Sequence, residues 1–456
     1  MRDVAQPGSA PRSGRGGRWF ESSHPDFFFP SFLYLRSLMK ILLRQARIID
    51  PSSPFHQQTK DILIEDGIIK DIGEINNASS EEINIEGLHV SNGWLDIFSN
   101  FCDPGFEYKE TLETGSKAAG AGGYTDVMIL PNTSPVVHNK AGIEYIVQRS
   151  KDFAVNIHPI AAVTKNTEGK ELAEMYDMQQ SGAVAFSDGT SSIQSSGLLL
   201  KALQYLRAID KAVIQLPDDK SINPSGLMNE GIVSTQLGLQ GKPAIAEELM
   251  IARDIELVKY TEGKIHFTGV STVKSIELIR KAKSQGLNVT CSVTPYHLCF
   301  TDEDLLSYDT NLKVNPPLRS KEDQQALKQA LLDGTIDCIA THHLPQDTDH
   351  KVVEFEYAHF GMLGLETSFA VIRTFFAELS IEKLVEALSI KPRLIFGLPK
   401  NAIDKNSSAS LSLFLPDEKW SVEALHSKSK NSPFIGRELT GRPIGIINKD
   451  KVFLNE

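Results

Sequence analysis

The sequence predicts an α/β protein: a (β/α)8 barrel of the TIM type with a small β-sandwich satellite formed by both chain ends. Two observations lead to this prediction. Short apolar runs alternate with longer helical patterns through the middle of the chain, and the segments on either side return to short β-type runs. We therefore expect the barrel at 91–404, the satellite at 39–90 and 405–456, and an extension outside the fold at 1–38.

The first segment, residues 1–38, shows neither helical nor strand periodicity. It is rich in Gly, Ser and Arg, and Pro30 breaks the apolar stretch that a signal peptide would need. Met39 is followed at once by the alternating run KILLRQARIID. We hypothesise that Met39 is the biological start. N-terminal sequencing of the protein from its native host tests this, and a peptide beginning before Met39 would contradict it.

The satellite is predicted from β-type runs at both ends of the body. The first are KILLRQARII (40–49), DILIEDGIIKDIGEI (61–75) and INIEGLHV (83–90), and the second run contains Asp66-Gly67, a dipeptide typical of two-residue hairpin turns. The last are LSLFLP (411–416) and RPIGIINKDKVFL (442–454). We expect these two groups of strands to pair with each other.

The barrel is predicted from repeated strand and helix patterns. YTDVMIL (124–130) precedes the helical AGIEYIVQRSKD (141–152), and the alternation continues to LNVTCSV (287–293) and IDCIATHH (336–343). Repeated βα units indicate a parallel sheet, and about 300 residues of them favour a closed barrel over an open sheet. Reactive groups are then expected where the strands end.

Composition excludes several classes of function. No apolar run approaches the roughly 18 residues that span a bilayer, so we expect no membrane association. The net charge of −11 repels phosphate backbones, so nucleic acid is not expected as a partner. The 4 cysteines lack paired spacing for a structural zinc and are too few for a disulfide scaffold. We expect reduced thiols and a cytoplasmic protein.

Several motifs resemble those of one enzyme family. They are PGFEYKET (104–111), AAGAGGYTDVMILPNTSP (118–135), HFTGVST (266–272), AKSQGLNVTCSVTPYHLCFTDEDL (282–305), YDTNLKVNPPLRS (308–320), DGTIDCIAT (333–341), FGMLGLET (360–367) and NSPFIGRELTG (431–441). In this order the motifs resemble dihydroorotases of the amidohydrolase superfamily. The resemblance implies zinc at the barrel mouth and interconversion of carbamoyl aspartate and dihydroorotate in pyrimidine biosynthesis.

The resemblance also identifies where that family's zinc ligands would stand. Its first strand carries a His-x-His pair and then an arginine for the substrate carboxylate, at the positions of Phe98, Asn100 and Cys102 here. Two further ligand histidines correspond to Leu216 and Gly269. Phenylalanine has no lone pair to donate, and an amide is a poor zinc ligand beside imidazole. We therefore expect no metal at these positions.

Two residues at matching positions keep donor atoms. Asp188 lies in the turn that carries the family's metal-bridging acid, and the sequence leaves open which aspartate of that turn it matches. It can orient a polar ligand or cap the turn before Gly189, and we weigh the two equally. His342 stands at the family's catalytic aspartate, and His343 next to it is expected to point the other way along a strand. Gln346 takes the place of a substrate-contacting histidine.

Part of the substrate pocket is expected to persist. The resemblance assigns Asn132, Asn311, Phe360 and Gly361 to it. By contrast, Phe98 and Leu216 would fill a metal cavity with apolar side chain, at a gain of roughly 1.5 to 3 kcal/mol for each buried residue. This pattern indicates a site converted to core beneath a surviving pocket.

These observations predict a catalytically inactive dihydroorotase-like protein with a structural or regulatory role in pyrimidine biosynthesis. Inactive relatives of this kind can scaffold aspartate carbamoyltransferase, so we expect that enzyme or a second copy of this chain as partner. One alternative is an active dihydroorotase or related cyclic amide hydrolase that uses Asp188 and His342, perhaps with His343, and then zinc as cofactor. Another is a sensor that binds a carbamoyl or pyrimidine-like ligand through Asn132. The sequence does not decide oligomeric state, residual binding or the partner.

Overall fold

The structure, a computed structural model, describes residues 40–76 and 81–455. The predicted extension at 1–38 and the proposed start at Met39 lie outside the described residues. No helix in the described part of the chain is both long and apolar enough to cross a membrane. The boundaries expected at residues 90 and 405 stay a prediction.

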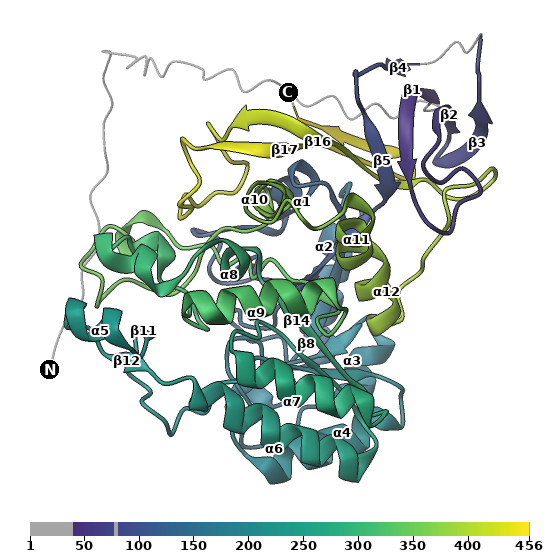
Figure 1. Cartoon of the computed structure of the whole chain (residues 1–456). Helices are drawn as coiled ribbons and strands as arrows, with labels where there is room; N and C mark the ends of the chain where they lie inside the picture. The colour runs from purple at the N-terminus through teal and green to yellow at the C-terminus, as the bar shows by residue number, and fades with distance from the viewer. Residues whose placement is uncertain (1–39, 77–80, 456) are drawn as a thin grey trace, which may run out of the picture. The chain divides into compact units, whose positions relative to one another are not determined.

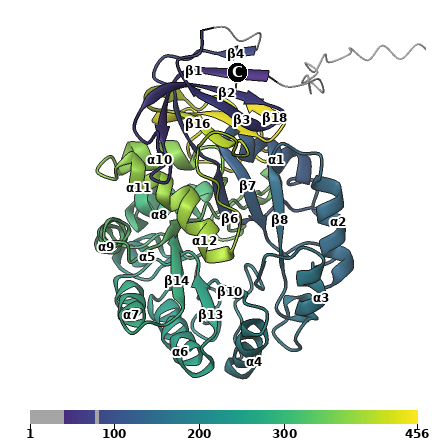
Figure 2. The ribbon, with the colours of Figure 1, turned by 90° about the vertical axis from the view of Figure 1, so that its right-hand side faces the viewer.

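Eight parallel strands form the predicted barrel in the order of the sequence (Figure 2). Both faces of these strands are covered, which explains why they read as continuous apolar runs instead of alternating ones. An N–H···O=C bond of 2.8 Å from Asn100 to His343 joins the segment after the first strand to the segment after the last. The strands are β6 (Trp94–Ser99), β7 (Tyr124–Ile129), β8 (Asn156–Ala161), β9 (Ala185–Phe186), β10 (Ala212–Gln215), β13 (Lys264–Phe267), β14 (Val289–Val293) and β15 (Cys338–Ile339).

Helices surround the barrel strands. Side-chain oxygens of Thr111, Ser195, Thr272 and Ser320 accept backbone N–H bonds at the starts of α1, α4, α7 and α9, so the turns that leave the strands also cap the helices. The helices are α1 (Leu112–Ala121), α2 (Lys140–Ser150), α3 (Met175–Gln180), α4 (Ser196–Arg207), α6 (Ile245–Thr261), α7 (Val273–Ser284), α8 (Pro295–Cys299), α9 (Lys321–Leu332), α10 (Ser368–Phe375), α11 (Ile381–Val385) and α12 (Lys391–Phe396).

An excursion from the barrel between β10 and α6 was not predicted. The paired strands β11 (Met228–Asn229) and β12 (Gly241–Lys242) enclose the short helix α5 (Ile232–Leu237). In Figure 1 this unit lies at the edge of the body. Its sequence has no sustained period, which is why the apolar pattern gave no signal for it.

The two chain ends pair as predicted, since β5 is antiparallel to β16. Hydrogen bonds join all the satellite strands into one mixed sheet, and a shared core includes Leu43, Ile62, Leu411 and Leu413 (Figure 1). Asp66 and Gly67 form the predicted hairpin turn, with φ of 50° and 75°. The strands are β1 (Lys40–Ile49), β2 (Thr59–Glu65), β3 (Ile68–Gly73), β4 (Glu81–Ile83), β5 (His89–Asn92), β16 (Ser410–Ser421), β17 (Glu438–Asn448) and β18 (Lys451–Leu454).

Candidate functional site

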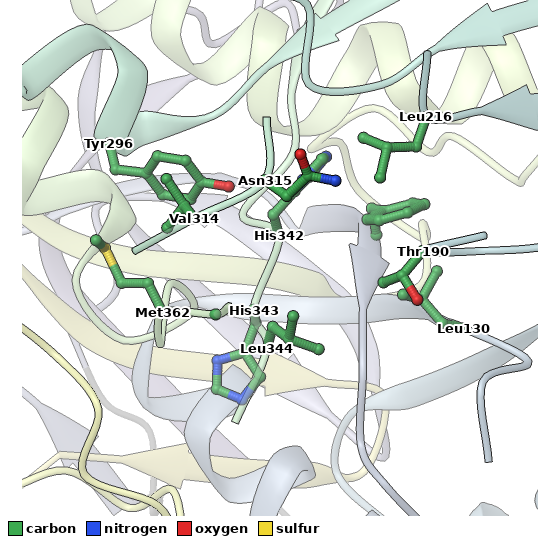
Figure 3. A pocket seen from close by; sticks show the side chains of 12 residues that line it. Leu130, Thr190, Leu216, Tyr296, Val314, Asn315, His342, His343, Leu344 and Met362 are labelled. Carbon is green, nitrogen blue, oxygen red and sulfur yellow. The ribbon is translucent and has the colours of Figure 1, made fainter. Parts of the chain in front are cut away.

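A small pocket lies inside the barrel where the parallel strands end. We call it the floor pocket. It has a volume of about 20 Å³, room for roughly one water molecule. Figure 3 shows Leu216 and Thr190 on one side of it and Tyr296 and Met362 on the other, with His342 between them. The lining is mostly apolar side chain, so this part of the barrel is close to filled.

Phe98 and His342 line the floor pocket, and Gly269 lies against His342. The rings of Phe98 and His342 lie 4.5 Å apart between centroids. Gly269 has a φ of +69°, and a Cβ built on it would stand 2.6 Å from Cε1 of His342. The absence of a side chain at Gly269 therefore makes room for the imidazole, and these sequence-distant positions are sterically coupled.

His342 is held as a buried, neutral ring. Its Nε2 lies 2.7 Å from Oγ1 of Thr268, whose oxygen also accepts a bond of 3.0 Å from Ser292. Burial lowers the pKa of His342 to about 3, with smaller contributions from His297 and His266. A ring that stays uncharged and satisfied at neutral pH is a poor proton donor for catalysis.

His343 has different neighbours from His342. The expectation that the two are adjacent residues of one strand is wrong, because β15 ends at Ile339 and His342 has a φ of +46°. The Nδ1 of His343 accepts the N–H of Gly364 at 3.3 Å, and its Nε2 lies 3.5 Å from Oε2 of Glu110. Phe101 meets the imidazole edge to face at 6.3 Å. The two histidines are therefore not arranged as a chelating pair.

Asp188 is hydrogen-bonded to Thr164. Its two carboxylate oxygens accept the backbone N–H of Thr164 at 2.9 Å and the Thr164 hydroxyl at 2.6 Å. Burial raises the pKa of Asp188 to about 6. The adjoining turn is fixed by Asn132, which donates to the Asp188 carbonyl at 3.1 Å and accepts from the N–H of Thr190 at 3.0 Å. The structure thus places Asp188 in a structural hydrogen-bond network.

A second, larger cavity adjoins the floor pocket and shares Thr190, Leu216, Asn315 and Leu344 with it. We call it the mouth cavity. Its volume is about 580 Å³. Of the predicted pocket residues, Asn132 and Phe360 line the mouth cavity, and Gly361 lines the floor pocket. Asn311 is in neither lining; its backbone N–H donates to Asp309 at 2.9 Å.

Asn100 and Cys102, at two further family positions, also line the mouth cavity. The Asn100 side-chain oxygen accepts the N–H of Cys102 at 2.8 Å, so its best donor atom is already engaged. Burial raises the pKa of the Cys102 thiol to about 12, with a smaller contribution from Glu110. The thiol therefore stays protonated at neutral pH and is a weak metal ligand.

A C-terminal segment, residues 426–431, is hydrogen-bonded to the loops around the mouth cavity. We call it the strap. Glu110 accepts hydrogen bonds from the Ser427 hydroxyl and from the N–H of Lys428, the latter at 3.1 Å. Ser429 donates to the Lys109 carbonyl at 2.7 Å, and Asn431 accepts the N–H of Gln346 at 3.0 Å. One segment therefore fixes the loop after β6 and the loop after β15 together.

Comparison with known proteins decides the family. Residues 89–275 match the family model described as "Dihydro-orotase-like". The chain is 41% identical over 424 residues to "Dihydroorotase" of Pelotomaculum thermopropionicum, covering 92% of this chain and 99% of the relative. It is 39% identical over 426 residues to "Dihydroorotase" of Syntrophus aciditrophicus, covering 92% of this chain and 100% of that relative. This chain belongs to the dihydroorotase family.

Solved structures agree with this assignment at the level of the fold. The L-hydantoinase (dihydropyrimidinase) of Arthrobacter aurescens superposes with a TM-score of 0.80 at 25% identity, covering 92% of this chain and 96% of that one. The dihydropyrimidinase of Brevibacillus agri superposes with a TM-score of 0.77 at 20% identity, covering 91% of this chain and 95% of that one. The barrel and the mixed sheet are thus common to this family member and to hydantoinases.

The residues present do not fit the zinc that the dihydroorotase resemblance implies. Phe98 and Leu216 offer no donor atom, and Gly269 has no side chain. Over residues 40–76 and 81–455, no group of three or more His, Cys, Asp and Glu side chains is arranged to hold a metal ion.

Sequence reasoning missed two lysines of the mouth cavity, Lys109 and Lys313. Both lie within motifs that carry the family resemblance, PGFEYKET and YDTNLKVNPPLRS. The available signal was a lysine within LKV, a short apolar stretch, which is unusual for a residue that is normally exposed.

Proposed function

We propose that this dihydroorotase-family chain does not carry out zinc-dependent hydrolysis and instead has a structural or regulatory role in pyrimidine biosynthesis. The supporting observation is a floor pocket of about 20 Å³ that is lined by Phe98 and His342, with His342 packed against Gly269. A catalytic zinc needs three protein donors and an open position for water. Neither the side chains nor the free volume of the floor pocket supplies them.

A second candidate is dihydroorotase activity, which the comparisons favour. Relatives named "Dihydroorotase" are about two-fifths identical to this chain over nearly its whole length. The chain would then hydrolyse its substrate at a non-standard site that uses Asp188 and His342 as polar groups. The arrangement of both side chains in other hydrogen bonds is the argument against it.

One experiment separates the two candidates. The full chain and the relative from Pelotomaculum thermopropionicum are produced side by side in zinc-supplemented medium, dialysed, and measured for bound zinc and for turnover of dihydroorotate and carbamoyl aspartate. We expect less than one tightly bound zinc per chain and background turnover for this protein. A reproducible stoichiometry of one or two metals with turnover would overturn the proposal and establish the second candidate.

The proposed role requires a partner, and aspartate carbamoyltransferase or a second copy of this chain is the partner we propose. A chain with a net charge of −11 favours a basic partner face, so association should be faster at low salt. A pull-down from native extract at low and high salt, with light scattering of the purified chain, tests this. Recovery of a monomeric chain alone at both salts would contradict it.

A further inference from the structure

Five exposed apolar side chains lie on the outside of the molecule, at and beside the excursion that contains α5 (Figure 1). Ile232 of α5 is 86% exposed, and Val352 of the loop after β15 is 77% exposed. The others are Leu306, Tyr308 and Val353. We call these five residues the outer apolar surface. They are absent from the linings of the mouth cavity and the floor pocket, so this surface is separate from both.

Tyr308 joins the two parts of the outer apolar surface. Its hydroxyl donates to the carbonyl of Leu237, the last residue of α5, at 2.8 Å. Its ring meets the ring of Phe355 edge to face, with 6.4 Å between the centroids. Leu306 belongs to the 3-10 helix η2 (Asp302–Ser307), which packs against α5. The exposed side chains therefore stand on segments that contact one another.

Buried polar contacts hold these segments in place from beneath. The buried Arg319 donates to the side-chain oxygen of Asn229 at 2.9 Å and to the carbonyl of Lys242 at 3.1 Å. Asn229 in turn donates to Oδ2 of Asp302 at 2.8 Å. Asn229 and Lys242 lie in the strands β11 and β12 that enclose α5, and Asp302 begins η2, so these bonds fix α5 and η2 together. A surface that is already ordered loses little conformational freedom on binding.

Carboxylates without ion-pair partners flank the outer apolar surface. Glu230 precedes α5, Glu303 lies in η2 and Glu354 follows the exposed valines, and all of them are exposed. Within the described residues none of these acids forms an ion pair. By contrast, Glu277 on the outer helix α7 pairs with Lys274 at 2.9 Å. The outer apolar surface therefore has a rim of negative charge that the chain itself does not neutralise.

The sign of this charge distinguishes the occupants that the surface could take. A second copy of the chain, seated on the same surface, would place its own negative rim against this one. An anionic membrane surface would be repelled for the same reason. A protein with apolar side chains flanked by lysine or arginine would instead bury the apolar centre and neutralise the rim.

We propose that the outer apolar surface binds a segment of another protein in which apolar side chains are flanked by lysine and arginine. The inference rests on the proposed function only in that the chain has a protein partner, and it adds the surface and the chemistry of that contact. Binding does not depend on what the barrel contains, because the surface lies outside both cavities.

The test uses a synthetic amphipathic helix made of leucine and lysine. The peptide carries a fluorophore, and its anisotropy is measured as the full chain is added at low salt. The same peptide with glutamate in place of lysine is the charge control. We expect the leucine–lysine helix to bind with a dissociation constant below about 100 μM, and the leucine–glutamate helix at least tenfold more weakly. Added salt should weaken the leucine–lysine helix.

A double variant of the apolar centre locates the binding on the chain. Ile232→Ser with Val352→Ser should weaken the leucine–lysine helix at least tenfold, because two exposed apolar contacts are lost. Tyr260→Ser with Leu394→Ser is the matched control, since both residues are exposed apolar side chains on the outer helices α6 and α12. This control should leave the affinity unchanged.

A second double variant tests the rim. Glu303→Gln with Glu354→Gln should weaken the same helix at least threefold and reduce the effect of salt, because two charges that attract lysine are removed. Glu256→Gln with Glu378→Gln is the matched control at exposed acids of α6 and of the segment after α10, and should leave the affinity unchanged. All substituted side chains are exposed, so urea denaturation should show each variant folded.

Several results would overturn the inference. They are absence of binding of the leucine–lysine helix, equal binding of the leucine–glutamate helix, and unchanged affinity in either surface variant. Self-association of the unchanged chain in light scattering that Ile232→Ser with Val352→Ser abolishes would also overturn it, because the surface would then bind a second copy. Failure of the helix to bind to a zinc-free, inactive preparation overturns this inference alone, whereas turnover with bound zinc overturns the proposed function alone.

Discussion

The floor pocket and the mouth cavity occupy one barrel and share lining residues, yet they are built in opposite ways. The floor has about 20 Å³ of free volume among mostly apolar side chains, whereas the mouth keeps about 580 Å³ among amides, aromatic rings and the ammonium groups of Lys109 and Lys313. The floor combines residues at the strand ends, such as Phe98 and Leu216, with loop residues such as Val314. The mouth is formed by loops, which the strap holds from outside.

The difference teaches that one part of a site can be filled while the part beside it stays open. Filling the floor adds to the hydrophobic core and therefore to stability. Burying the Lys313 ammonium at the mouth costs stability, because its charge is removed from water and is only partly offset by Glu356. The two regions therefore contribute to stability with opposite signs.

The largest expected change in the free energy of unfolding is for a substitution in the floor pocket. Phe98→Ala should lower the free energy of unfolding by about 3–5 kcal/mol, because it opens a cavity in a packed region. Phe106→Ala makes the same chemical change at the half-buried mouth and should cost about 1 kcal/mol. Urea denaturation of both variants measures the difference. Equal costs would mean that the floor is not packed as described.

A second comparison isolates the contact between Gly269 and His342. Gly269→Ala should cost about 2–4 kcal/mol, from backbone strain and from overlap with the ring. Gly238→Ala is the matched control, since Gly238 has a φ of +68° with nothing within 4 Å of its built Cβ, and should cost about 1 kcal/mol.

The same comparison extends to a double variant. Adding His342→Ala should remove most of the excess cost at Gly269, because the overlapping ring is gone. Denaturation of the two single variants and the double variant gives the coupling energy. Strictly additive effects would contradict the steric coupling between these positions.

At the mouth, the free energy of unfolding should rise as the pH increases from about 8 towards about 10.4, the ordinary lysine pKa. Burial lowers the pKa of Lys313 to about 8, partly opposed by Glu356. Burial also lowers the pKa of the nearby Lys351 to about 7, with Lys313 lowering it and Asp309 raising it. Above these values the folded chain has released lysine protons that the unfolded chain still holds, so the cost of burying the charge is removed.

Urea denaturation between pH 7 and pH 9.5, with the unchanged chain and the Lys313→Met variant side by side, measures this rise. The Lys313→Met variant should lack the rise that begins near pH 8. A rise that persists unchanged in that variant would assign the titration to another group.

The smallest effect concerns stability at the mouth. Lys109→Met should lower the free energy of unfolding by about 1 kcal/mol, because it removes one hydrogen bond, between the half-buried Lys109 and the buried Gln346. Thermal unfolding of this variant beside Phe98→Ala checks it. A loss as large as that of Phe98→Ala would show that the mouth lysine is part of the core.

Most of the fold was predictable because it depends on local periodicity. The runs that form β7, α2 and β14 were recognised within a few residues, and Asp66-Gly67 marked its hairpin correctly. The excursion containing α5 was missed, since its elements are too short to show a period. The single sheet of the satellite depends on pairings between residues more than 300 positions apart, which local periodicity does not reveal.

The candidate site was predictable residue by residue but not as an arrangement. Phe98 and Leu216 stood out as apolar residues at strand ends, whereas nothing in the sequence indicates that Asp188 bonds Thr164. The fit of His342 against Gly269 depends on a glycine φ and a ring position that only the folded barrel sets. Lys313 was missed because its burial is a tertiary property.

The strap also sets an order of events in time. Ser427 follows its partner Glu110 by 317 residues. At about 5–20 residues per second, a ribosome needs roughly 15–60 s to deliver it after the first loop has emerged. The residues that line the floor pocket have all been synthesised by Met362, well before the strap exists. During synthesis the core of the barrel can therefore fold before the strap has bonded the loops around the mouth cavity. In that interval these loops are exposed to chaperones and proteases.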